Sequence, residues 1–153
     1  YRPDGRGSFI MSMSPSATLF YGIAYDDFTK PESWEGLDWE EVLAKKTGLV
    51  APVEEYNAEI PEIYRAYRDY WKACREMREL VGVEFGYAGY LGESDSTQKY
   101  IYITKSRQSV DWGAEPVRSF ETDSGWKALV LKFCEMLEIP YVQPQWHIAA
   151  AYG

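Results

Sequence analysis

The stretch of residues 60–81, IPEIYRAYRDYWKACREMRELV, decides how the rest of the chain is interpreted. Its apolar and aromatic residues are spaced alternately three and four apart, which places them on one stripe of a helix; they are Ile60, Ile63, Tyr67, Tyr70, Cys74, Met77 and Val81. Pro61 suits the first turn of a helix, and Gly82 suits a left-handed residue that ends one. We therefore predict a helix here, with its apolar stripe packed on a sheet.

The opposite side of this helix carries a basic stripe, made of Arg65, Arg68, Lys72 and Arg75. Acidic residues lie among these cations at distances of three or four residues, and each such pair on a helix surface contributes about 0.2–0.5 kcal/mol. Two interpretations stay open. The stripe is either a solvated face with ordinary ion pairs or a surface that binds an anion.

The composition indicates one globular domain. The chain has 153 residues, is 46% hydrophobic and carries a formal net charge of −8, which allows a sizeable core. We expect residues 1–12 to be a leader or a remnant of expression and residues 13–153 to form the domain. No apolar run is long enough to cross a bilayer, and the acidic balance opposes binding to nucleic-acid phosphates. We therefore expect neither a membrane nor a nucleic acid as a direct partner.

The order of elements predicts the fold class. Clusters of aromatic and β-branched residues predict strands at 17–25, 83–91, 99–105 and 145–152. Further helices are predicted at 39–47, opened by a capping box at Asp38 and Glu41, and at 125–138, while 106–122 is expected to be irregular. This order predicts a single α+β domain, with a mixed or antiparallel sheet of about four strands and three helices packed mainly on one face.

Three of the expected strands share aromatic residues interleaved with Gly and Ala, as in FYGIAY (20–25), FGYAGY (85–90) and WHIAAAY (146–152). Small residues on one strand face allow another part of the structure to approach closely. We expect helices rather than a ligand to make that approach.

The sequence lacks the common signatures of catalysis. It has no phosphate-binding glycine loop and no G-x-S-x-G motif. A single histidine, His147, argues against a multi-histidine metal site and is expected to face solvent or a polar partner from the last strand. Cys74 and Cys134 are expected to be buried free thiols of a reducing compartment. We predict no catalytic residue, no metal and no cofactor, and an enzyme is the less favoured class.

Roughly the C-terminal half of the chain resembles a known group of proteins. VEFGYAGY (83–90), YIYITK (100–105), FCEMLEI (133–139) and PQWHIAAAYG (144–153) are similar to segments of small uncharacterised proteins of tailed bacteriophages, which share a hairpin, a late helix and a terminus of the type P-x-W…YWG. The terminus here reads Ala-Tyr-Gly. The resemblance implies a phage protein made in the cytoplasm of an infected bacterial host, and it implies no activity.

The acidic charge is concentrated in residues 26–59, where ten Asp or Glu residues stand against three lysines. We expect a non-enzymatic interaction protein, a phage-encoded inhibitor of a host defence or nucleic-acid-handling machine, whose acidic residues meet a basic surface of a host protein. The candidate binding residues are Glu32, Glu35, Asp38, Glu40 and Glu41. The alternative is a protein or enzyme that binds a nucleotide-like anion with an aromatic pocket and the basic stripe Arg65, Arg68, Lys72 and Arg75. The sequence makes no prediction of the oligomeric state.

Overall fold

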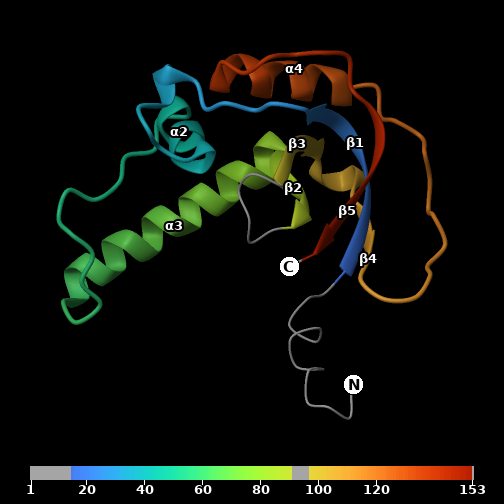
Figure 1. Ribbon diagram of the computed structural model, residues 1–153. Helices are drawn as coiled ribbons and strands as arrows, with labels where there is room; N and C mark the ends of the chain where they lie inside the picture. Colours follow the sequence, from blue (N-terminus) through green and yellow to red (C-terminus); the bar gives the residue numbers. More distant parts are fainter. Residues whose placement is uncertain (1–14, 91–96, 153) are drawn as a thin grey trace, which may run out of the picture.

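The expected strands and helices all form, and their order gives an α+β domain (Figure 1). The computed structural model describes residues 15–90 and 97–152. The strands are β1 (Pro15–Tyr25), β2 (Val83–Tyr90), β3 (Thr97–Ile103), β4 (Gln108–Val110) and β5 (Gln145–Tyr152). The helices are α2 (Trp39–Lys46), α3 (Pro61–Val81) and α4 (Trp126–Leu137), with 3-10 turns η1 (Glu32–Trp34) and η3 (Thr104–Ser106). The expected leader, residues 1–12, lies outside the described residues.

The five strands form one mixed sheet in the order β3-β2-β5-β1-β4. Strand β2 runs parallel to β5, and the other pairs are antiparallel. Strand β3 pairs with β1 as well as with β2, so β1, β3, β2 and β5 close into a ring. Strand β4 is a correction to the sequence prediction, which treated 106–122 as irregular. Its three residues pair with β1, where Ala17 lies opposite Val110.

Helices α2 and α4 cover one face of the sheet and build the main core with it. Leu43 of α2, Ile101 of β3 and Phe133 of α4 are fully buried there. Trp34 of η1 is buried in this core, and its Nε1 donates a hydrogen bond to the carbonyl oxygen of Leu137 in α4 at 2.6 Å. Leu129 of α4 lies at the edge of this core and is 37% exposed.

The opposite face of the sheet is an aromatic layer without a helix. The rings of Phe20 and Tyr100 stack at a centroid distance of 4.0 Å. The small residues leave room for the rings of this layer and for the close approach of β3 to β1. A Cβ on Gly22 would lie 1.9 Å from the Ile101 carbonyl oxygen, and one on Gly86 would lie 2.3 Å from the Tyr100 ring. The expectation that helices approach these small residues is therefore wrong, since a strand and a ring fill the space.

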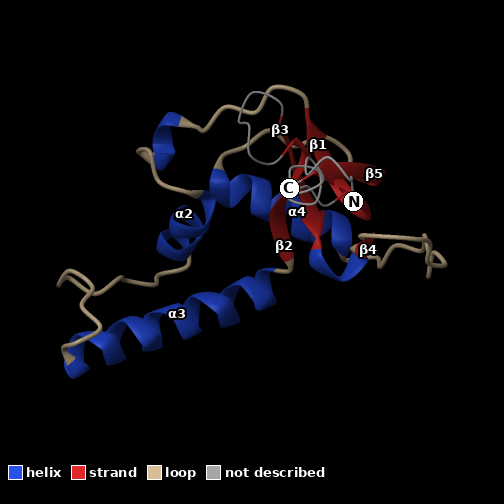
Figure 2. Cartoon of the chain, turned by 60° about the horizontal axis from the view of Figure 1, so that its bottom comes forward, coloured by secondary structure: helices blue, strands red, loops and turns tan. Residues whose placement is uncertain are grey.

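Helix α3 begins and ends where the sequence predicts, but it does not pack its stripe on the sheet. None of its residues is buried, and Figures 1 and 2 both show it extending away from the sheet and the other helices. Only Met77 and Val81, near its C-terminal end, pack against the main core. The reason is that α2 and α4 already cover that face of the sheet. Cys74 is consequently half-buried, whereas Cys134 is buried as expected.

Candidate functional site

The five predicted acidic residues are all exposed and follow one another along η1 and the start of α2. Glu32 and Glu35 flank the buried Trp34 anchor, and Asp38, Glu40 and Glu41 follow around the first turn of α2; together we call these five residues the acidic surface. A helix N-terminus carries a partial positive charge, which stabilises carboxylates placed there. The predicted binding residues are therefore all exposed, two of them beside the buried Trp34 of η1 and three at the start of α2.

The local charge pairing at this surface is incomplete. Asp38 occupies the N-cap position without a side-chain capping hydrogen bond, so the predicted capping box does not form. Its carboxylate instead pairs with Lys30 at 3.2 Å, with both side chains largely exposed. Glu40 pairs with Arg78 of α3. Among the described ion pairs, none includes Glu32, Glu35 or Glu41.

Two tyrosines border the acidic surface. Burial raises the pKa of Tyr87 on β2, and the charges of Asp38 and Glu40 raise it further. Burial also raises the pKa of Tyr70 on α3 to about 12, with smaller contributions from Cys74 and Glu41. Both phenols therefore stay protonated donors at neutral pH. Tyrosines beside carboxylates suit a protein interface, where aromatic residues dominate binding energy.

The basic stripe lies on the open outer face of α3. Arg65, Arg68, Lys72 and Arg75 are all exposed. Lys72 pairs with Glu76 at 4.0 Å, as expected, while Asp69 pairs with Arg68 at 3.8 Å rather than with Arg65. None of the four hollows described below is lined by a residue of this stripe. These four hollows therefore do not combine the cations with an aromatic pocket.

A groove separates α2 from α3. It consists of two hollows of about 300 and 330 Å³ that share Glu41 and Tyr70. Trp71, Cys74 and Met77 line the α3 side, while the α2 side continues into residues 48–51 with Leu49 and Val50. We call this feature the α2–α3 groove. Its walls are mixed: Arg78 joins the apolar residues on the α3 side and pairs with Glu40 of α2, and the α2 side is both apolar and charged.

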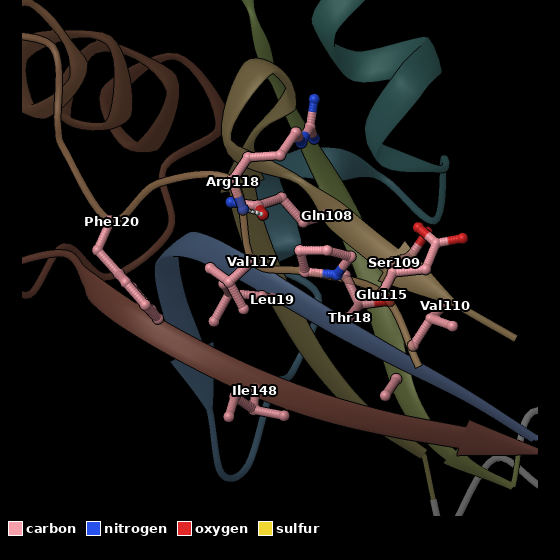
Figure 3. A pocket seen from close by; sticks show the side chains of 12 residues that line it. Thr18, Leu19, Gln108, Ser109, Val110, Glu115, Val117, Arg118, Phe120 and Ile148 are labelled. Atoms are coloured by element: carbon pink, nitrogen blue, oxygen red, sulfur yellow. Dashed lines mark hydrogen bonds between the residues drawn. The ribbon is translucent and has the colours of Figure 1, made fainter. Parts of the chain in front are cut away.

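A third hollow, of about 280 Å³, lies over β1, β4 and β5 under the segment 115–120 (Figure 3). The side chain of Gln108 holds this segment, because it accepts a hydrogen bond from the Arg118 amide at 2.7 Å and donates one to the Ser119 carbonyl at 2.9 Å. Leu19, Val117, Phe120 and Ile148 line its apolar part. Sequence reasoning missed this hollow, since the pairing of β4 gave no periodic signal.

The fourth hollow, of about 340 Å³, opens at the aromatic layer beside His147. The imidazole stacks on Phe20 at 5.2 Å between ring centroids. It is half-buried beside the hollow, so it faces solvent only in part and its ring neighbour is aromatic. Cys134 lies elsewhere, in contact with the Tyr25 hydroxyl at 3.8 Å and the Pro140 carbonyl at 3.7 Å. Burial raises the pKa of the Cys134 thiol to about 11, which disfavours the thiolate that a nucleophile needs.

The described residues hold no group that could bind a metal ion, and comparisons with known proteins give no match. Within residues 15–90 and 97–152, no three His, Cys, Asp or Glu side chains are grouped so that they could hold a metal ion. In the same part of the chain, no helix combines the length and apolarity of a membrane span. No family model, no curated protein and no solved structure matches this chain.

Proposed function

We propose that this chain is a non-enzymatic interaction protein, a phage-encoded inhibitor of a host defence or nucleic-acid-handling machine, and that its acidic surface binds a basic surface of a host protein in the bacterial cytoplasm. The observation that supports the proposal is that Glu32, Glu35, Asp38, Glu40 and Glu41 are all exposed, within ten positions of one another, in η1 and the first turn of α2. The phage and host parts of the proposal rest on the sequence resemblance.

The concentration of charge supports a partner of opposite sign. Residues 26–59 carry a formal charge of −7 out of −8 for the whole chain. Neighbouring carboxylates repel one another, and charge spread over the surface would keep the protein equally soluble. A concentrated patch also accelerates the encounter with a basic surface. The alternative, an anion site on the basic stripe, has less support because that stripe faces open solvent on a convex helix.

The experiment measures association kinetics with the partner. An affinity pull-down from the host identifies a candidate, and the association rate is then recorded at low and at high salt. We expect the rate to fall about tenfold as salt rises and to fall by a similar factor at low salt when all five acidic residues are replaced by their amides. Dissociation should change less, because charges at an interface rim act mainly on encounter.

A control variant with the same change in charge separates a local contact from net charge. It carries amides at five exposed positions outside the acidic surface: Asp111, Glu115, Glu121, Glu135 and Glu138. We expect this control to bind at nearly the original rate. If both variants associate equally slowly, the net charge of the protein sets the association rate and the acidic surface has no special role. An association rate that changes neither with salt nor with the acidic-surface substitutions would refute the proposal.

A further inference from the structure

The hollow beside His147 lies where two neighbouring strands part. Within the described residues, β2 and β5 pair with each other only over their last two positions, 89–90 with 151–152. The hollow, of about 340 Å³, opens just before these pairs, between Ala88 of β2 and residues 147–150 of β5. Its volume falls at the small end of the range of known ligand sites.

The parting of β2 and β5 leaves backbone hydrogen-bonding groups of β5 without a strand partner. Each residue from 145 to 152 lies opposite a residue of β1, but in an antiparallel pair only alternate residues direct their N–H and C=O groups to that neighbour. Two of residues 147–150 therefore direct theirs toward β2, with which they do not pair. No turn or loop backbone bond of the described chain takes up these groups. One side of the hollow consequently offers donors and acceptors.

A stack of three rings forms another side of the hollow. Phe20 lies between Tyr100, at 4.0 Å and 11° between the ring planes, and His147, at 5.2 Å and 22°. Because all three residues line the hollow, it lies alongside the stack and meets the edges of the rings. Ring edges carry partial positive charge and attract the negative face of another aromatic ring. This side therefore suits a planar ring that lies across it.

The hydroxyl of Tyr100 is free to bind a compound in the hollow. Tyr100 is 6% exposed, yet no described group hydrogen-bonds its hydroxyl, whereas the Tyr102 hydroxyl donates to the Glu84 carboxylate at 3.2 Å. Throughout the described residues, every side-chain oxygen or nitrogen that is shut off from solvent has a hydrogen-bond partner. The Tyr100 hydroxyl therefore reaches accessible space, and the space that Tyr100 lines is this hollow.

We propose that this hollow, which we call the β2–β5 site, binds an uncharged, planar heteroaromatic compound of the size of a nucleobase. None of its described lining residues is Lys, Arg, Asp or Glu, so it has no group that would recognise a phosphate or a carboxylate. The ring stack contacts the flat face of the compound. The Tyr100 hydroxyl, the Gln98 amide and the unpaired backbone groups of β5 bind polar atoms at its edge. The site shares no residue with the acidic surface, so it is independent of the proposed function.

The first test uses His147, the one histidine of the chain, as a reporter of binding. Its ring protons are followed by NMR while adenine, hypoxanthine, cytosine or uracil is added to the intact chain. We expect at least one base to shift these signals to saturation with a Kd of about 0.1–1 mM, in the range of rigid ligands of this size. Adenosine monophosphate should bind no more tightly than the base. Indole, whose ring has no acceptor nitrogen or oxygen, should bind about tenfold more weakly or not at all.

Paired variants test the individual contacts. Tyr100→Phe removes a hydroxyl from the site, while Tyr102→Phe removes one that is already paired with Glu84. We expect Tyr100→Phe to weaken base binding about three- to tenfold and Tyr102→Phe to leave it unchanged. Ala149→Leu places a larger side chain at the wall of the hollow and should abolish the saturable shift. Ala66→Leu adds the same side chain at an exposed position of α3 and should have no effect.

Circular dichroism and tryptophan fluorescence establish that each variant is folded before binding is measured. If Tyr100→Phe does not fold, Gln98→Ala replaces it, because Gln98 is exposed and its amide lines the same hollow. Base binding that is unchanged in both the hydroxyl or amide variant and Ala149→Leu would overturn the proposal. So would the absence of a saturable shift with every base up to about 5 mM, or tighter binding of adenosine monophosphate or indole than of the bases.

Discussion

Gly22 of β1 and Gly86 of β2 lie where the sheet leaves no room for a side chain, so substitutions there test the described strand pairing. In the Gly22→Ala variant the new Cβ would lie 1.9 Å from the carbonyl oxygen of Ile101 and 2.8 Å from the Cα of Tyr102. Both are backbone atoms of β3, so relief requires β1 and β3 to separate where they pair. Overpacked cores typically lose 1–3 kcal/mol and occasionally more. We expect a loss of about 3 kcal/mol or more, a large part of a typical total stability of about 5–15 kcal/mol.

Gly86→Ala should cost less, because its new Cβ meets a side chain. The nearest atoms belong to the Tyr100 ring, at 2.3 Å. That ring is 6% exposed and stacked on Phe20, so it has little room to turn. We expect about 1–3 kcal/mol. In a Tyr100→Leu background the same substitution should cost clearly less, since the clashing ring is gone.

Gly113→Ala is the matched control. Its φ of +84° strains any side chain, but a Cβ there would meet no atom within 4 Å. It should lose about 1–2 kcal/mol from backbone strain alone. Urea unfolding followed by tryptophan fluorescence measures all three, with constant m-values as evidence of two-state unfolding. Equal losses for Gly22→Ala and Gly113→Ala would mean that the strands do not cross as described.

Three further outcomes follow from burial. Phe133→Ala should destabilise the protein by about 3–5 kcal/mol, because Phe133 is fully buried. Tyr70→Ala, on the half-buried stripe of α3, should cost about 1 kcal/mol; similar losses in urea titrations would refute the position of Tyr70 outside the main core. In the native protein Cys74 should react with a thiol reagent much faster than Cys134; equal rates would contradict the burial of Cys134. Since the folded state raises the pKa of Cys134 from 9.0 to about 11, the unfolded chain ionises first and stability should fall as pH rises from 9 to 11. Burial also raises the pKa of Tyr70 and Tyr102 to about 12, so these tyrosines add to the fall above about pH 10. Cys134→Ala should make the fall between about pH 9 and 10 shallower, and an unchanged slope there would exclude the thiol as a source.

Local patterns were sufficient to locate nearly all the elements. The three–four spacing and the Pro61 and Gly82 signals gave α3 to within a residue of its bounds, because a helix depends on contacts between neighbours in the chain. The fifth strand escaped prediction, since Gln108–Val110 is only three residues long and is stabilised by its pairing with β1. The cluster of acidic residues was also visible in the sequence, as its members lie within ten positions of one another.

What the sequence by itself determined is therefore local: the helices, the longer strands, the amphipathic stripe of α3 and the concentration of negative charge. The tertiary structure alone decided which apolar surfaces meet. An amphipathic stripe records that a helix face avoids water, but it does not record what covers that face, because the hydrophobic effect has no direction. Helices α2 and α4 occupy the sheet, so of the apolar stripe of α3 only Met77 and Val81 reach the main core, and the stripe stays half-buried. The small residues of β1 and β2 likewise signalled a close approach, and only the paired strands showed that the approaching atoms are those of Ile101 and Tyr100.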